Sequence, residues 1–173
     1  MLATRRWLEK AVIGLNLCPF AEHPYRGDRV RLFVSERRSA AGLLADLHSE
    51  LRSLDASDPR ECETSLLIHP WVLNDFIEYN EFLEVCDGAV AELGLEGSLQ
   101  VASFHPQYQF AGSQPDDIEN FTNRSPFPML HLLREASVER AIAAAGDTAK
   151  IYEKNMRTLR ALGRAGWQRL WLD

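Results

Sequence analysis

Short β-type segments alternate with longer helical segments along this chain, and this alternation restricts its fold more than any other feature. Residues 30–36 (VRLFVSE), 63–70 (ETSLLIHP) and 99–106 (LQVASFHP) are rich in apolar and β-branched residues and predict three strands. Residues 40–54 and 71–93, between them, carry apolar residues at helical spacing. Because each helix is long enough for a crossover, the strands are expected to pair in parallel.

Further helices are expected on either side of this alternation. Amphipathic patterns over residues 4–15, 128–145 and 148–171 bring the expected helices to about five. We predict an α/β fold, a compact sandwich with a small, mainly parallel sheet of at least three strands, in a single globular domain over residues 1–173. Because two strands alternate only partly, a two-layer sheet with one poorly covered face, completed by a short antiparallel strand, stays open as an alternative.

Composition excludes several classes of function. A hydrophobic share of 46% with 25% charged residues is typical of a globular domain rather than a disordered chain. The net charge of −6 and the absence of a basic stripe argue against nucleic-acid binding. No apolar run reaches the roughly 18 residues that a membrane span needs. The first apolar stretch lacks a small-residue cleavage site, and the three cysteines form no CxxC motif, so we expect a cytoplasmic protein.

Two successive predicted strands end in the same His-Pro dipeptide. If the strands are parallel, His69 and His105 lie on one rim of the sheet, and the first strand brings Glu36 to that rim. Ligands of open α/β sheets bind outside the carboxyl ends of the strands. We therefore predict a catalytic site in which His105 and His69 act as general acid and base and Glu36 orients one imidazole.

The same three side chains allow two other interpretations. Two neutral imidazoles and a carboxylate can hold a divalent metal such as iron or zinc, with positions left open for substrate. Alternatively, each histidine only closes the end of its strand through a hydrogen bond, with proline stopping the ladder. The shared site also assumes that the two strands are neighbours, since one intervening strand would separate the histidines.

A run without helical or strand periodicity, residues 107–127, follows the third strand. Loops of this length are usually disordered or functional, and its aromatic residues, among them Tyr108, favour an ordered flap. Asn123 and Arg124 precede a proline-started segment predicted as a helix. Helix N–H groups and the guanidinium together suit a phosphate or carboxylate, which predicts a small anionic metabolite as substrate, with Tyr108 lining the pocket. Alternatively, Arg124 pairs with acidic residues of the loop as a structural clip.

Three other candidates follow from spacing. His131 and Arg134 share one face of the predicted helix, and we assign both to substrate binding, with a structural role as the alternative. His131 is also a further candidate ligand if a metal is bound. Cys18 precedes a proline in a constrained turn and is a candidate nucleophile, although a buried thiol is the simpler interpretation.

Long strings of this sequence resemble a known family, the bacterial domain of unknown function 1415. The strings are TRRWLEKAVIGLNLCPFA, LLIHP, ELGLEGSLQVASFHPQYQFAG, DDIENFTNRSPFP and LHLLREAS, and together they extend over almost all of the chain. The resemblance implies a bacterial, cytoplasmic protein and brings no established activity. The stretch EHPYRGDRV matches least, which makes His23 a weaker candidate than His69 or His105.

Three functions are therefore open. The first is a small enzyme that uses histidine acid/base chemistry on an anionic small metabolite, and the second is a metalloenzyme with a His/His/Glu site. The third is a non-catalytic module that binds a ligand or partner, and a homodimer would follow if the last helix exposed its apolar face. The apolar residues of that helix fit a core position better on periodicity alone, and they are Ile151, Leu159, Leu162 and Trp167.

Overall fold

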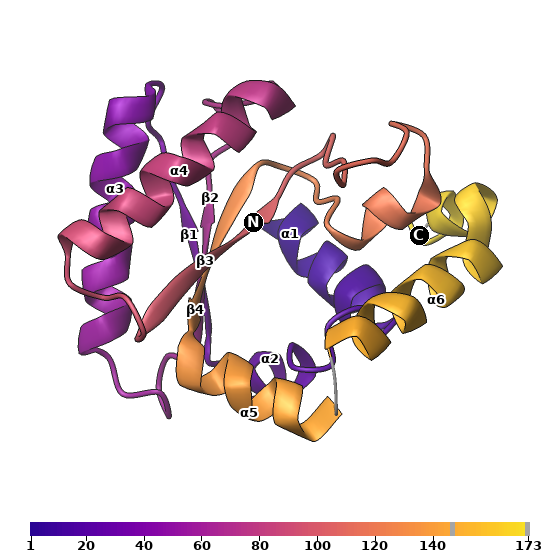
Figure 1. The fold of residues 1–173 in the computed structure, drawn as a ribbon, viewed down its shortest axis with the longest axis horizontal. Helices are drawn as coiled ribbons and strands as arrows, with labels where there is room; N and C mark the ends of the chain where they lie inside the picture. The colour runs from indigo at the N-terminus through magenta and orange to yellow at the C-terminus, as the bar shows by residue number, and fades with distance from the viewer. Residues whose placement is uncertain (146–147, 172–173) are drawn as a thin grey trace.

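The computed structural model describes residues 1–145 and 148–171. In chain order its elements are α1 (Leu2–Trp7), the π-helix η1 (Leu8–Ile13), α2 (Glu22–Arg26), β1 (Val30–Val34), α3 (Ala40–Ala56), β2 (Thr64–Ile68), α4 (Phe76–Glu92), β3 (Leu99–Phe104), the 3-10 helix η2 (Ile118–Thr122), β4 (Met129–Arg134), α5 (Glu135–Ala145) and α6 (Thr148–Arg169). The sheet stands between two helical layers, with α3 and α4 on one face and α1, α2, α5 and α6 toward the other (Figure 1). The predicted α/β class is confirmed.

The sheet is mixed, so the prediction of a mainly parallel sheet is wrong. Its strand order is β1-β2-β4-β3, with β1 parallel to β2 and β4 antiparallel to both of its neighbours. The three predicted strands do run in one direction, but β4 lies between β2 and β3. The short antiparallel strand of the alternative interpretation therefore sits inside the sheet.

The strand β4 lies within residues 128–145, for which the sequence pattern predicts a helix. A central strand buried on both faces reads as an almost continuous apolar run, which periodicity alone does not distinguish from a helix. In the structure Met129, Leu130 and Leu132 are fully buried, and the helix α5 begins only at Glu135. Pairing on both edges decides in favour of the strand, because it satisfies the backbone groups of this buried segment.

Each face of the sheet covers a separate hydrophobic core. The core toward α3 and α4 takes Leu130 and Leu132 from β4, while the opposite core takes Met129. Leu67 and Leu66 divide β2 in the same way, as strand alternation requires. Helix α3 begins as expected, since the Ser39 hydroxyl accepts a hydrogen bond from the Gly42 N–H. Within the described residues, no helix is long and apolar enough to cross a membrane.

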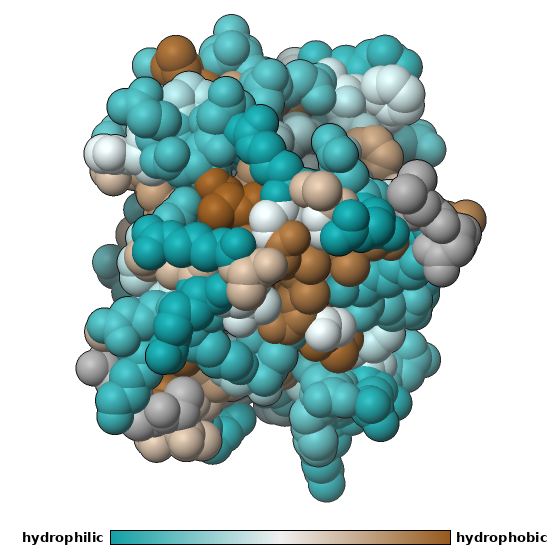
Figure 2. All heavy atoms as spheres, turned by 90° about the vertical axis from the view of Figure 1, so that its right-hand side faces the viewer, coloured by the Kyte–Doolittle hydropathy of each residue, from teal (hydrophilic) through white to brown (hydrophobic). Residues whose placement is uncertain are grey.

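The α6 side of the molecule shows an apolar area surrounded by hydrophilic side chains (Figure 2). Of the apolar residues predicted on this last helix, Leu159 is fully buried and Trp167 is 9% exposed, so they belong to the core as expected. Ile151 and Leu162 are half-buried. The homodimer stays a prediction.

Candidate functional site

The two histidines of the predicted rim lie on either side of one tyrosine. The ring centroid of Tyr79 is 5.8 Å from that of His69 and 5.0 Å from that of His105. Both imidazoles are fully buried. Because β4 separates their strands, the rings do not meet directly, and an aromatic side chain from α4 fills the space between them.

Hydrogen bonds assign both imidazoles a structural task. His105 Nδ1 accepts from the Gln107 N–H at 3.0 Å, and its Nε2 donates to the Leu73 carbonyl at 3.2 Å. His69 Nδ1 donates to the Val72 carbonyl at 3.0 Å, and its Nε2 has no hydrogen-bond partner in the described part of the chain. Burial lowers the pKa of His69 to about 4 and lowers the pKa of His105. Both side chains are therefore neutral at pH 7, which fits the strand-closing interpretation.

Glu36 does not complete a site with these histidines. It is exposed, and the rim position before it is used by the Ser35 hydroxyl, which donates to Asp46 at 2.7 Å. Residues 1–145 and 148–171 contain no group of three or more His, Cys, Asp or Glu side chains that could hold a metal ion. The predicted ligand set of Glu36, His69 and His105 is thus not brought together.

Arg124 is used inside the loop. Its guanidinium donates to the carbonyls of Tyr108, at 3.2 Å, and Pro115, and lies 4.5 Å from the ring centroid of Phe121. Its own carbonyl accepts from the Trp7 indole at 2.9 Å. The predicted helix N-terminus beside Arg124 is absent because residues 129–134 form a strand. The anion site expected there is not assembled.

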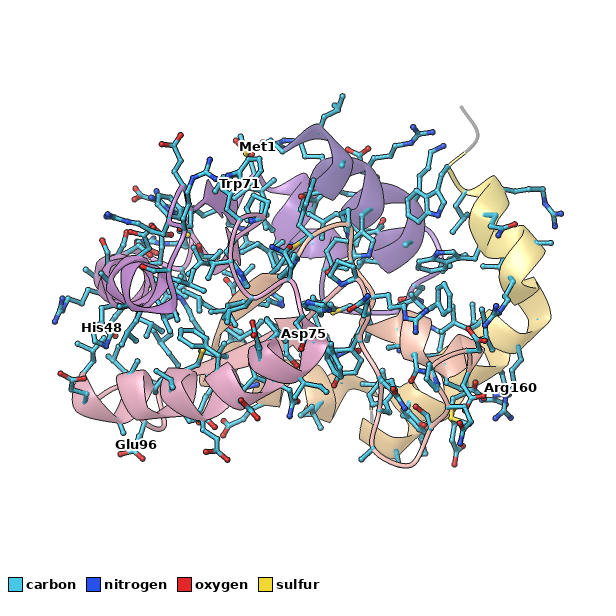
Figure 3. All side chains as sticks on the ribbon, turned by 90° about the horizontal axis from the view of Figure 1, so that it is seen from above. Met1, His48, Trp71, Asp75, Glu96 and Arg160 are labelled. Atoms are coloured by element: carbon cyan, nitrogen blue, oxygen red, sulfur yellow. The ribbon has the colours of Figure 1, made fainter. Side chains whose placement is uncertain are left out.

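Two acidic residues, Asp116 and Glu119, bind α6 and leave Arg124 to backbone carbonyls. Asp116 pairs with Arg164 at 2.7 Å, and Arg160 donates to Glu119 at 2.6 Å. These ion pairs lie at the α6 end of the molecule, because Arg160, viewed from above, stands at the opposite end from His48 of α3 (Figure 3). The expected clip between Arg124 and these carboxylates is therefore replaced by a link between the loop and the C-terminal helix.

Asn120 organises the loop, a role that the sequence pattern did not indicate. Its fully buried amide accepts from the Phe110 N–H and the Ser113 hydroxyl and donates to the Gln114 carbonyl. Asn123, predicted to bind substrate, donates to the Ser103 carbonyl at 3.1 Å instead. An Asn between aromatic loop residues is a weak signal, because asparagine is also common in exposed turns.

Tyr108 and Arg134 also have structural contacts. The Tyr108 ring packs against Phe76 and Phe110, with centroids 5.5 and 5.0 Å apart. Arg134 ends β4 and donates to the carbonyls of Leu54 and Ser57 near the end of α3. The prediction that Arg134 shares a helix face with His131 is wrong, since residues three apart in a strand point to opposite faces.

An apolar cavity of about 540 Å³ lies on the other face of the sheet. Its walls come from the sheet and from η1, α2 and α5. The connections before and after α2 contribute further lining residues. Apolar side chains dominate the lining, among them Leu8, Val12, Phe20, Leu66, Phe104 and Val138. This volume falls in the range of about 300 to 1,000 Å³ that is typical of small-molecule sites.

His131 brings a polar group to this cavity from the centre of the sheet. The Thr64 hydroxyl donates to the Leu132 carbonyl at 2.6 Å, so it accepts from His131 Nε2 at 2.8 Å. That bond places the ring proton on Nε2 and leaves Nδ1 as an acceptor without a partner among the described residues. Burial lowers the pKa of His131 to about 4, so the ring is neutral at pH 7. His131 is therefore an uncharged hydrogen-bond acceptor in an apolar lining.

The mouth of the cavity carries charged groups. Arg29 lies 3.1 Å from Glu63 and donates to His23 Nδ1 at 2.6 Å. Glu63 also accepts from the Ser137 hydroxyl and lies 3.8 Å from Arg140. No local sequence pattern indicates this cluster, since its members come from α2, α5 and the turns before β1 and β2.

Cys18 lines the cavity as well, and burial raises the pKa of its thiol. A protonated thiol is a poor nucleophile, so this environment favours the buried-thiol interpretation over the nucleophile. Cys18 then contributes to the lining as a small apolar group.

Fold and site together define an α/β protein with a mixed four-stranded sheet and an apolar cavity between that sheet and its N-terminal helices. The chain belongs to the family described as "Protein of unknown function (DUF1415)", which matches residues 1–169 and confirms the resemblance seen in the sequence. No curated protein matches the chain, and no solved structure does.

Proposed function

We propose that this protein binds a small molecule whose body is apolar, in the cavity between the sheet and the helices η1, α2 and α5. The observation that carries the proposal is the cavity itself, with about 540 Å³ of space and a mostly apolar lining. Burying apolar ligand surface there contributes roughly 25 cal/mol per Å² removed from water. The bacterial, cytoplasmic setting implied by the family resemblance belongs to the same proposal.

The polar groups of the lining support a defined orientation of the ligand. His131 offers Nδ1 as an acceptor, which suits a hydroxyl or amide N–H on the ligand. A small number of polar groups in an apolar pocket commonly fixes ligand orientation in this way. Because the pKa of His131 is about 4, its imidazole is a weak base at pH 7, which favours binding over proton transfer at this residue.

The first experiment is isothermal titration with straight-chain alcohols of increasing length. We expect affinity to rise with chain length until the cavity is full. Ala141 lines the cavity from α5, whereas Ala143 of the same helix is exposed and does not line it. Ala141→Phe should weaken binding at least tenfold, and the matched control Ala143→Phe should not. The proposal fails if no alcohol binds, or if both variants bind as the wild type does.

A second candidate is the enzyme in which His69 and His105 perform acid/base chemistry on an anionic metabolite. One observation favours it, since His69 Nε2 is a buried nitrogen without a partner among the described residues. Full burial of both rings counts against it, because a substrate must reach the nitrogen. Turnover of a carboxylate or phosphate metabolite that is abolished by His69→Gln, with unchanged thermal stability, would revive this candidate.

A further inference from the structure

We infer that the ligand is a single-chain amphiphile whose carboxylate or phosphate head lies in a basic hollow at the cavity mouth. This inference rests on the proposed function, because the apolar chain of the same molecule would occupy the cavity. It names the chemical class of the ligand and adds a second binding element outside the apolar lining.

The hollow is contiguous with the cavity. It is an open surface depression of about 410 Å³, lined by His23, Arg26, Gly27, Arg29 and Arg60. Two of these residues, His23 and Arg29, also line the apolar cavity. A ligand with its chain in the cavity therefore reaches the hollow by passing this shared pair. Three arginines and a histidine form the lining, and no carboxylate residue does.

Within the shared pair, Arg29 is held in place by its partners and orients His23 through a hydrogen bond. The Arg29 side chain is only 18% exposed, and it is held by Glu63 at 3.1 Å and by the Pro59 carbonyl at 3.3 Å. It donates through Nη2 to His23 Nδ1, so a neutral His23 carries its proton on Nε2. Nε2–H is then a further donor beside the hollow.

The two outer arginines can move toward an anion at little cost. Arg26 pairs with Glu22 at 2.6 Å and Arg60 with Asp58 at 2.6 Å. The arginine side chains are 78% and 89% exposed, and exposed pairs of this kind contribute little to stability. Guanidinium groups bind carboxylate and phosphate oxygens through two parallel hydrogen bonds. The head group would thus meet two mobile donors, Arg26 and Arg60, on the outer side of the hollow and the less exposed donor Arg29 next to the cavity.

The distribution of charge sets the position of the head group. The cavity wall is mostly apolar and would leave a charged head group without water, whereas the hollow is lined by Arg26, Arg29 and Arg60, which attract an anion. A free anion would lack the apolar contacts, and an uncharged chain would lack the arginines. Only a molecule with both parts satisfies the two regions together.

The test is isothermal titration of the full chain with decanol, decanoate, decyl phosphate and inorganic phosphate at constant ionic strength. We expect decanoate and decyl phosphate to bind at least tenfold more tightly than decanol, and inorganic phosphate to bind at least tenfold more weakly than decyl phosphate. The double variant Arg26→Gln/Arg60→Gln should weaken both anionic amphiphiles at least fivefold and leave decanol unchanged. Arg52→Gln, an exposed arginine of α3 across the sheet, is the matched control and should change nothing.

Each contrary result has its own meaning. If decanol binds as tightly as decanoate, or if the double variant weakens none of the anions, the inference is overturned and the proposed function stands. Inorganic phosphate that binds as tightly as decyl phosphate would reduce the hollow to a simple anion site and also overturn the inference. If neither decanol nor any anionic amphiphile binds, the proposed function and the inference fail together.

Discussion

The imidazole of His105 donates a hydrogen bond from Nε2 to the carbonyl oxygen of Leu73, 3.2 Å away. Leu73 has a positive φ of 56°, which is uncommon for a leucine and requires support from its surroundings. The histidine that ends β3 therefore holds the segment between β2 and α4 in a conformation that it would not keep by itself.

This relationship predicts a structural effect for His105→Ala. We expect the free energy of unfolding to fall by roughly 2 kcal/mol, because the carbonyl of Leu73 and the N–H of Gln107 lose their hydrogen-bond partner, the buried His105 ring. Urea denaturation measures the loss. Ligand affinity in the cavity should stay within twofold of the wild type. Unchanged stability combined with lost binding would contradict this assignment and place His105 in a site.

Stability is expected to fall as the pH decreases from 7 to 5. The pKa of His69 and of His131 is lowered from 6.5 to about 4 by burial, so in this range the unfolded chain binds protons that the folded chain does not. The contribution of these two neutral histidines to the free energy of unfolding is fully present above pH 6.5 and is lost progressively as the pH falls to 4. His69 alone accounts for roughly 2 kcal/mol between pH 7 and pH 5.

Denaturant titrations at a series of pH values measure this slope, and nitrogen chemical shifts of the rings report their protonation. Carboxylates contribute little in this window, since the pKa of Asp58 is lowered to about 2 by Arg60 and that of Glu119 is lowered by its hydrogen bonds. A flat profile from pH 7 to pH 5, or rings that protonate near pH 6, would contradict the buried neutral state.

A buried carboxylate under the sheet should make one arginine unusually important. Glu50 is 3% exposed and accepts from Arg31 at 2.8 and 3.0 Å and from Ser65 at 3.0 Å. Arg31→Met leaves this charge without its cation and should cost about 3 kcal/mol of unfolding free energy, measured by thermal or urea denaturation.

Arg37 provides the matched control for this change. It pairs with Asp46 at 3.0 Å, but its side chain is 57% exposed, so Arg37→Met should cost less than about 1 kcal/mol. Replacing both members of the buried pair, as Arg31→Met/Glu50→Leu, should recover much of the loss. Equal losses for the two single variants would show that burial of Glu50 is not the decisive factor.

The loop should become easier to cleave when its link to α6 is removed. Arg160→Gln removes the ion pair with Glu119, whose carboxylate side chain is 17% exposed, and should raise the rate of limited proteolysis within residues 107–117. Added salt should also raise the rate of proteolysis of the wild-type protein, because salt screens the ion pair between Arg160 and Glu119. Arg157→Gln, an exposed arginine on the same helix, is the control, and the prediction fails if both variants are cleaved at the same rate.

Local patterns were sufficient for the elements that the sequence placed well. β1, β2 and β3 begin within one residue of the predicted starts, and α3 begins directly after its predicted cap, Ser39. Each of these depends on neighbours in the chain, such as a hydroxyl at a helix start or apolar residues at a regular period. His69 and His105 do stand at the same end of the sheet, because their strands run in one direction.

The predicted site lies at the strand ends on the α4 side of the sheet, whereas the apolar cavity lies on the opposite side, and this difference has a physical reason. The expectation that ligands bind at the carboxyl ends of strands depends on where polar residues lie along the chain. It does not consider whether each polar side chain already has a hydrogen-bond partner in the fold. Here the partners of His105 and Arg124 are backbone carbonyls of segments remote in sequence. His23 was ranked low, yet it stands between the cavity and the basic hollow.

By itself the sequence determined the α/β class, three strands of one direction and several helix limits, since these follow from short-range periodicity and capping. Family membership followed from long shared strings of sequence. Tertiary structure decided that MLHLLR is a strand, that His131 is a neutral acceptor and that α2 and α5 leave a cavity against the sheet. The physical reason is that strand pairing, desolvation and packing volume depend on residues far apart in the chain, which local patterns do not contain.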